Sequence, residues 1–238
     1  VRRACRREGM PRRAGRRRER QAGGPRGAGG PGTAEQAGRG TAEQAGRGPP
    51  RGWAGHDVRV LHPLVPPVLA WFDTAARDLP WRAADRTPWG VLVSEVMLQQ
   101  TPVARVEPLW RRWMVRWPTP ADLAEESTAE VLRAWDRLGY PRRALRLQEC
   151  ARAVVERHDG ELPRTEAELL ALPGVGTYTA AAVMAFAHGR RAVVVDTNVR
   201  RVLSRAIAGD ALPPPSLTRG ELRDAATLVP DDDGTASR

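Results

Sequence analysis

The sequence has no lysine, two cysteines, and only two residues each of tyrosine and phenylalanine. All 38 lysine-plus-arginine positions are arginine, so a mechanism that needs a lysine amine as nucleophile is excluded for this sequence. Cys5 and Cys150 are too few for a disulfide framework or a metal cluster, and such usage is typical of a reducing compartment. No apolar run approaches the roughly 20 residues of a membrane helix, and the arginine-rich start lacks the apolar core of a secretory signal.

The positive charge is confined to one end of the chain. The net charge of the 238 residues is +10, and residues 1–52 account for it with 14 arginines against four acidic residues. Residues 53–238 contain 24 arginines and 24 acidic residues, so they are neutral overall. Any affinity of this larger part for nucleic acid must therefore come from the local placement of charge.

Residues 1–52 consist largely of Arg, Gly, Ala and Pro, and they cannot bury a core. The segment Gly-Thr-Ala-Glu-Gln-Ala-Gly-Arg occurs twice, at 32–39 and 40–47, which is shorter than the repeat unit of a solenoid. We expect a disordered, basic, low-complexity tail. It either holds DNA phosphates electrostatically or is an extension ahead of the true start, since Met10 lies within it.

From Trp53 onward the composition is that of a globular domain, and its patterns are helical. No segment has a convincing period of two, so we predict an all-α domain over residues 53–230, followed by a loop at 231–238. Thr87-Pro88 is typical of a helix start. The expected helices cover about 64–77, 89–100, 102–116, 141–158, 177–188, 198–209 and 218–228.

Two further patterns refine this prediction. Ser127 and Thr165 each precede a glutamate by three residues, which is the capping-box pattern of a helix start. Trp110, Trp113 and Trp117 recur at helical spacing. We expect this tryptophan stripe to belong to the core rather than to stack on bases.

A glycine hairpin follows, in the segment Leu172-Pro-Gly-Val-Gly-Thr-Tyr-Thr179. Glycine permits a tight turn and a close approach to a ligand, and the first amides of the next helix can hold an anion. We interpret the segment as a helix–hairpin–helix that binds a phosphate, although a plain helix turn explains the glycines equally well.

Two carboxylates are candidates for catalysis. Glu95 lies mid-helix among apolar residues, and burial there would raise its pKa and make it a proton donor. Asp196 stands at the entrance to another helix, where it is either a second catalytic acid or an ordinary N-cap. A pair of carboxyl groups in different environments suits the cleavage of a glycosidic bond. Two separate, solvated acids are the more common explanation of such a spacing.

Four motifs occur in order between about Val68 and Val229. They are Ser94-Glu-Val-Met-Leu-Gln-Gln-Thr101, Trp135-x-x-Leu-Gly-Tyr140 with Arg143-Ala144, the glycine hairpin, and Val195-Asp-Thr-Asn-Val-Arg-Arg-Val202. Together they resemble the A/G-specific adenine DNA glycosylases, the MutY family of the helix-hairpin-helix base-excision superfamily. The resemblance implies the HhH-GPD fold. It also implies hydrolysis of the bond to adenine mispaired with 8-oxoguanine or guanine.

The resemblance assigns a role to each matching residue. Glu95 would protonate the departing adenine, and Asp196 would stabilise the cationic sugar. The other implied roles are support of the aspartate by Tyr178 and Asn198, insertion into the duplex by Gln100 and Tyr140, an adenine pocket of Trp81, Arg82 and Leu98, and phosphate binding by Gly174, Val175, Gly176 and Thr177. Base flipping into such a pocket is needed because the bond is out of reach in a duplex. Packing for Tyr140, helix capping for Gln100 and a solvated charge for Arg82 are the alternatives.

The sequence also departs from the family pattern. The family carries four cysteines for a [4Fe–4S] cluster after the last catalytic helix, and Cys5 and Cys150 cannot replace them. We therefore expect a C-terminally truncated catalytic domain with no metal ligands and no lesion-reading domain. Asp136-Arg137 also stands where the family more often has a glycine.

Several alternatives stay open for the function. An endonuclease III-like pyrimidine glycosylase would need a lysine near Tyr178, so the absence of lysine favours a monofunctional enzyme. A DNA-binding fragment with little or no turnover is the second alternative. The expected partner is duplex DNA with adenine mispairs, bound by a monomer that is cytoplasmic, associated with the nucleoid and independent of membranes.

Overall fold

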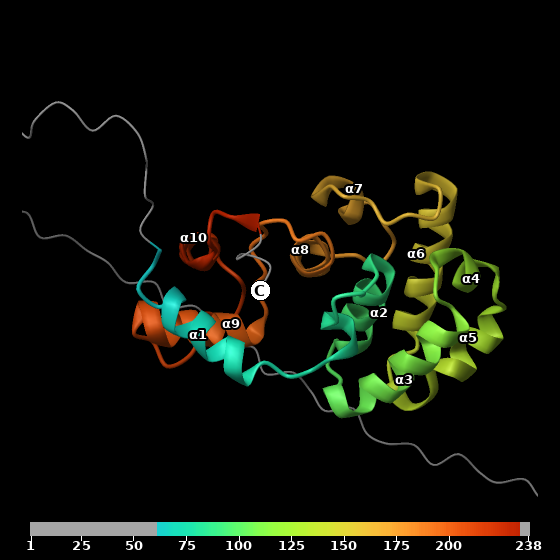
Figure 1. Ribbon diagram of the computed structural model, residues 1–238, viewed down its shortest axis with the longest axis horizontal. Helices are drawn as coiled ribbons and strands as arrows, with labels where there is room; N and C mark the ends of the chain where they lie inside the picture. The colour runs from blue at the N-terminus through green and yellow to red at the C-terminus, as the bar shows by residue number, and fades with distance from the viewer. Residues whose placement is uncertain (1–60, 234–238) are drawn as a thin grey trace, which may run out of the picture. The chain divides into compact units, whose positions relative to one another are not determined.

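The computed structural model describes residues 61–233, which form helices and loops with no strand among them (Figure 1). The predicted tail at 1–52 and the end of the predicted loop, 234–238, lie outside the described residues. The α-helices are α1 (Val65–Ala75), α2 (Pro88–Leu98), α3 (Val103–Arg116), α4 (Pro120–Glu125), α5 (Thr128–Trp135), α6 (Arg142–His158), α7 (Glu166–Leu170), α8 (Thr177–Ala182), α9 (Thr197–Leu203) and α10 (Arg219–Leu228). None of the helices in this range is long and apolar enough to cross a membrane.

Four short helical segments extend or connect these helices. Two are 3₁₀ turns, η1 (Pro80–Arg82) and η2 (Asp136–Leu138). The other two are π-helical continuations of α8 and α9, namely η3 (Val183–Ala187) and η4 (Ser204–Ala208). The all-α prediction is confirmed, with the predicted helices at 177–188 and 198–209 each divided into an α and a π part.

The end of α2 differs from the prediction, which continued the helix to residue 100. The helix begins as expected, with the Thr87 hydroxyl accepting a hydrogen bond from the Gly90 amide, but it ends at Leu98. Gln100 has a left-handed backbone, with φ of 56°. Pro102 also keeps Thr101 out of the helical region, because the residue before a proline avoids it. The chain therefore leaves the helix two residues early and carries Gln100 into a loop.

The predicted caps at Ser127 and Thr165 are half correct. Each side chain accepts a hydrogen bond from the amide three residues on, as a cap requires. The return bond of a capping box is missing, because the Glu130 carboxylate binds Arg116 and the Glu168 carboxylate binds the Thr165 hydroxyl. Among the described residues, complete capping boxes begin α4 and α10 instead.

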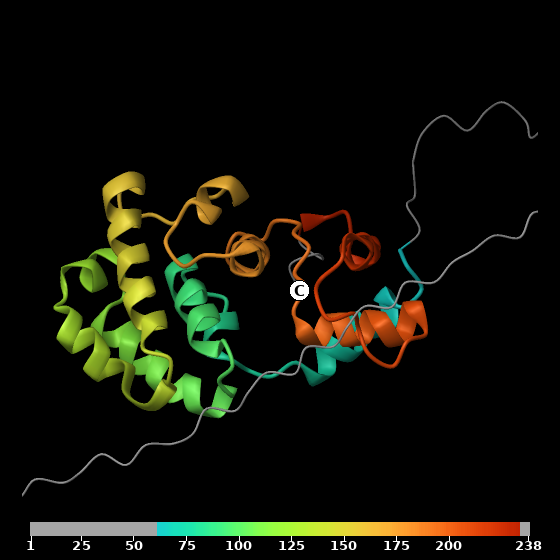
Figure 2. The same cartoon turned by 180° about the vertical axis from the view of Figure 1, so that it is seen from behind.

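The core is built around α2, whose residues from Trp89 to Met97 are all buried. Helix α6 packs against α2, α4 and α5 (Figure 2). The tryptophan stripe belongs to this core, as predicted: Trp113 is 1% exposed, and its ring meets those of Trp117 and Trp135 edge-on at 4.7 and 5.4 Å. Trp110 is partly buried and packs edge-on against Trp81.

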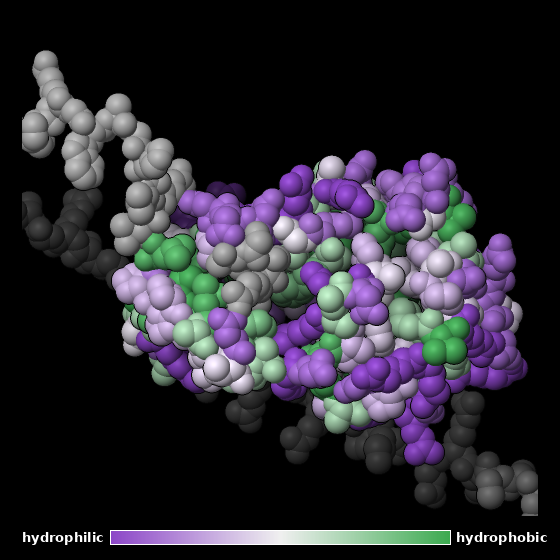
Figure 3. All heavy atoms as spheres, in the orientation of Figure 1, coloured by the Kyte–Doolittle hydropathy of each residue, from purple (hydrophilic) through white to green (hydrophobic). Residues whose placement is uncertain are grey.

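The helices that follow α6 carry the two remaining motifs. The hairpin joins α7 to α8, and Asp196 begins α9. Helix α9 is tied to α10 by an ion pair between Arg200 and Glu221, at 2.7 Å. Helix α1 is different, because Val65 is its only buried residue and its Val68 and Trp71 side chains are exposed. Figure 3 shows apolar residues gathered over this helix on an otherwise mainly polar face.

Candidate active site

Glu95 lies on the buried helix α2, and only 8% of its surface is exposed. Its neighbours along the helix, Ser94 and Val96, are buried as well. The carboxyl group lines a cavity of about 1010 Å³ that Asp196, on α9, also lines. Residues about a hundred positions apart therefore bring two carboxyl groups to one cavity.

The environment of Glu95 favours its protonated form. Burial is the largest influence and raises the pKa of the carboxyl group, and the nearby charge of Asp196 raises it further. A hydrogen bond from the Tyr178 hydroxyl and the charge of Arg82 lower the pKa, but the net shift is upward. A carboxyl group with a raised pKa can donate a proton near neutral pH. Burial and the Glu95 charge raise the pKa of Tyr178, so this phenol stays neutral and remains a donor.

Asp196 accepts hydrogen bonds from two residues of its own helix start, and a third residue orients one of them. One carboxylate oxygen accepts a hydrogen bond from the Val199 amide at 2.7 Å, which makes Asp196 the N-cap of α9. The other oxygen accepts from the Asn198 side-chain amide at 3.0 Å. The Arg201 guanidinium donates to the Asn198 oxygen at 2.6 Å. Helix α9 begins at Thr197, one residue before the predicted start, because the aspartate caps it.

The cavity gathers all four residues that the sequence analysis assigned to catalysis, but only three of the nine assigned to DNA or to the adenine pocket. Besides the two carboxylates, its lining includes Tyr178, Asn198, Leu98, Gln100 and Tyr140. Trp81 and Arg82, which were expected in the adenine pocket, are not among its lining residues. Trp81 is buried, and its ring centroid lies 5.7 Å from that of Trp110. The Arg82 guanidinium carbon lies over the Phe72 ring, 5.7 Å from the ring centroid.

Gln100 and Tyr140 share an unusual backbone. Both are left-handed, with φ of 56° and 48°, and each follows the end of a helical segment. Tyr140 is 64% exposed, so packing in the core does not explain it. Capping does not explain Gln100, because Gln99 occupies the C-cap position of α2. Both side chains stand at the cavity, where they are available to a ligand.

The two glycines of the hairpin differ in their backbone conformation and in the space around them. Gly174 is left-handed, with φ of 78°, and an added Cβ would lie 2.9 Å from the Cβ of Arg146. Gly176 has an extended backbone and open space around it, and it is the N-cap of α8 without any side-chain cap. Val175 is buried and Thr177 is exposed. The first amides of α8 therefore lack the side-chain oxygen that caps α9 and α10, as an anion site requires.

The described residues do not fit a metal cluster. No group of three or more His, Cys, Asp or Glu side chains within residues 61–233 is arranged to hold a metal ion. Cys150 is buried in α6, and burial raises the pKa of its thiol to about 12. Cluster ligation needs thiolates, and a neutral, enclosed thiol does not supply one.

Comparison with known proteins identifies the fold family. A family model described as "HhH-GPD superfamily base excision DNA repair protein" matches residues 93–226. This chain belongs to the HhH-GPD superfamily. It is 55% identical, over 164 residues, to the adenine DNA glycosylase of Mycolicibacterium smegmatis. The aligned residues make up 69% of this chain and 56% of that relative. The chain thus spans about half the length of the curated relatives that it matches.

Solved structures agree with this HhH-GPD assignment. A thermostable thymine-DNA glycosylase is 32% identical with a TM-score of 0.65, and the match covers 73% of this chain and 82% of that one. A non-covalent endonuclease III–DNA complex is 25% identical with a TM-score of 0.62, covering 73% and 78%. The HhH-GPD fold predicted from the four motifs is therefore confirmed.

Some functional candidates of this HhH-GPD protein were not assigned from the sequence. Arg143 and Arg200 both line the cavity, and Arg201 orients Asn198. All three lie within the four motifs, but the sequence attached no role to them. The sequence carries only a weak signal for such arginines, because only the structure reveals which carbonyl or amide oxygens an arginine reaches.

Proposed function

We propose that the protein is a monofunctional adenine DNA glycosylase that removes adenine mispaired with 8-oxoguanine or guanine in duplex DNA. The observation that carries this proposal is the pair of Glu95 and Asp196 at one cavity, with the pKa of Glu95 raised by burial. The similarity to adenine DNA glycosylases supports adenine as the base.

The proposed reaction begins with an adenine nucleotide that has left the duplex and entered the cavity. The Glu95 carboxyl group donates its proton to a ring nitrogen of adenine while the bond from the base to the sugar carbon breaks. The bonding electrons leave with the base, and the sugar becomes cationic. Asp196 stabilises that cation through its negative charge.

Water completes the reaction. A water molecule adds its oxygen to the cationic sugar carbon, and its released proton returns to the Glu95 carboxylate. The products are free adenine and an abasic site in an intact strand. The sequence has no lysine to form a Schiff base, so no lysine-dependent strand cleavage follows.

The roles toward DNA belong to the same proposal. The amides after Gly176 would hold a backbone phosphate, and Gln100 and Tyr140 would fill the gap left by the displaced adenine. Leu98, which lines the cavity, would contact the adenine base. The protein would act as a monomer on chromosomal DNA.

A single-turnover assay tests the proposal. A duplex with adenine opposite 8-oxoguanine is incubated with excess protein and then treated with alkali, which breaks abasic sites. We expect alkali-dependent cleavage at the adenine and none at thymine opposite guanine. Cleavage without alkali, or on oxidised pyrimidines, would favour the endonuclease III-like alternative. Binding without any base release would identify a DNA-binding fragment.

A further inference from the structure

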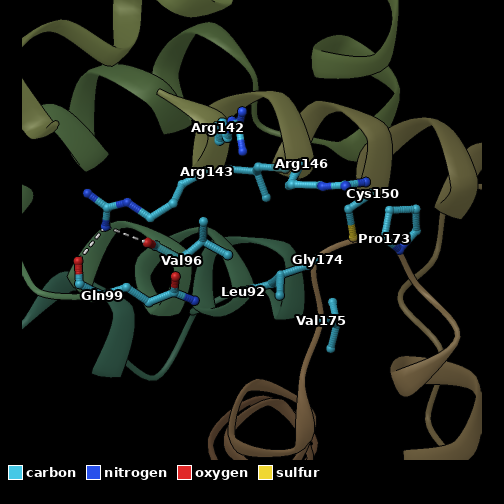
Figure 4. Close-up of a pocket in the computed structure, with 11 residues that line it drawn as sticks. Leu92, Val96, Gln99, Arg142, Arg143, Arg146, Cys150, Pro173, Gly174 and Val175 are labelled. Atoms are coloured by element: carbon cyan, nitrogen blue, oxygen red, sulfur yellow. Dashed lines mark hydrogen bonds between the residues drawn. The ribbon is translucent and has the colours of Figure 1, made fainter. Parts of the chain in front are cut away.

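Arg143, near the start of α6, joins two loops that are distant in the sequence. Nη1 donates to the carbonyl oxygens of Val96, Met97 and Gln99, at 3.1, 3.1 and 2.5 Å. Figure 4 shows the guanidinium reaching from α6 to the end of α2. Nη2 donates to the Thr101 hydroxyl at 3.2 Å and to the carbonyl oxygens of Leu138 and Gly139, at 3.0 and 3.2 Å.

The charge of Arg143 is balanced without any carboxylate among these acceptors. The carbonyl groups at the end of α2 carry the negative end of the helix dipole. The guanidinium carbon also lies 5.3 Å from the centroid of the Trp135 ring and 5.6 Å from that of the Tyr140 ring. The faces of aromatic rings attract a cation at such distances. A lysine could not replace this arrangement, because its point charge lacks the planar fork that serves several acceptors at once.

Two of the acceptors stand immediately before the two left-handed residues at the cavity. The Gln99 carbonyl precedes Gln100, and the Gly139 carbonyl precedes Tyr140. Residues other than glycine keep a left-handed backbone only where their surroundings fix it. One guanidinium therefore holds the peptide group ahead of each residue, and so constrains both at the same time.

We propose that Arg143 is a positioning residue that couples Gln100 to Tyr140, so that the two side chains enter the duplex as one unit. It presets both backbones before DNA arrives, and it promotes the displacement of adenine from the duplex rather than the breaking of the glycosidic bond. This inference rests on the proposed function, which assigns Gln100 and Tyr140 to the duplex.

The test separates base displacement from bond cleavage. 2-Aminopurine replaces the target adenine, and its fluorescence rises when the base leaves the stack. We expect Arg143→Lys to reduce the displaced fraction by about tenfold while duplex binding changes far less. Arg152→Lys is the matched control, because Arg152 lies on the same helix and donates to the Ala124 carbonyl, away from both loops. It should leave the displaced fraction unchanged.

A second measurement does not depend on the folding of the Arg143 variant. Gln100→Ala, Tyr140→Ala and the double variant are compared in the otherwise unaltered protein. Coupled residues give non-additive losses of displacement, and independent residues give additive ones. Additive losses, or an Arg143→Lys variant that displaces the base normally, would overturn the proposal.

Failure of the proposed function gives a different result. In that case the unaltered protein neither displaces 2-aminopurine nor releases adenine, and the positioning role is lost with it. A purely structural role for Arg143 predicts a lower melting temperature by circular dichroism and normal displacement at temperatures where the variant is folded. Such a result would leave the glycosylase proposal intact and reject the coupling.

Discussion

The Arg201 guanidinium donates a 2.6 Å hydrogen bond to the side-chain oxygen of Asn198, so the amide nitrogen of Asn198 must point toward Asp196. Without this bond the amide could rotate and present its oxygen to the carboxylate, which would repel it. The position of the Asp196 charge thus depends on Arg201, which acts on it through Asn198.

Replacing Arg201 by alanine should therefore impair the reaction more than DNA binding. We expect the single-turnover rate on adenine opposite 8-oxoguanine to fall by about 10- to 100-fold, since small misplacements at a reacting centre have effects of this size. Arg205→Ala is a suitable control, because Arg205 donates to the Ala211 carbonyl further along. Equal losses in both variants would contradict the role given to Asn198.

The raised pKa of Glu95 predicts a pH dependence. Because the protonated acid is the active form, the rate should decrease as the pH rises through the pKa of Glu95. Glu95→Gln cannot donate the proton, and we expect its rate to fall by about 10²- to 10⁴-fold. The variant should retain affinity for the duplex in a gel-shift measurement.

Tyr178→Phe tests the same acid in another way. The Tyr178 hydroxyl lowers the pKa of Glu95 by hydrogen bonding to its carboxylate. Removing the hydroxyl should raise that pKa further, so the alkaline limb of the pH–rate profile should move to higher pH. A limb that stays in place, or moves to lower pH, would show that a different group is titrating.

Gly174→Ala should weaken the hairpin. Gly160 offers a matched control, because its φ of 80° is almost the same as the 78° of Gly174 but its surroundings are open. Both substitutions add the strain of a left-handed alanine, about 1–2 kcal/mol. Only Gly174→Ala also presses against Arg146. We expect a larger fall in duplex affinity and in melting temperature for Gly174→Ala than for Gly160→Ala.

The Arg200–Glu221 pair should contribute to stability in a pH-dependent way. The hydrogen bond from Arg200 holds the pKa of Glu221 below its usual range. A lowered folded-state pKa means that the pair stabilises the protein above the unfolded-state pKa and is lost as the pH falls through the folded-state value. Glu221→Gln should thus lower the melting temperature near neutral pH, with the difference from the unaltered protein vanishing in acid.

The residue types of the candidate site can be proposed from the sequence, but their arrangement in space cannot. Glu95, Asp196 and Tyr178 were identified from motifs, because their residue types and order are local properties of the chain. The predicted C-terminal end of α2 was wrong, because the left-handed backbone of Gln100 takes the chain out of the helix, and the place of Trp81 in an adenine pocket stays a prediction. Four of the six hydrogen bonds of Arg143 reach residues more than 40 positions away, and no local pattern marks an arginine that donates to such distant carbonyl groups.

The tryptophans, including the cluster around Trp113, all lie in the N-terminal part of the sequence. All eight tryptophans precede residue 136, so the hairpin, α8, α9 and α10 contain no indole. Ultraviolet emission therefore reports α1, through the exposed Trp71, and the packing of α2 to α6, while the Asp196 helix has no tryptophan of its own to report its unfolding. Far-ultraviolet ellipticity reports all the helices, including α8, α9 and α10. A difference between the melting temperatures from ellipticity and from tryptophan emission would show that α9, the helix of Asp196, unfolds separately. Val202→Trp, on the exposed side of α9, would give that helix its own emitter.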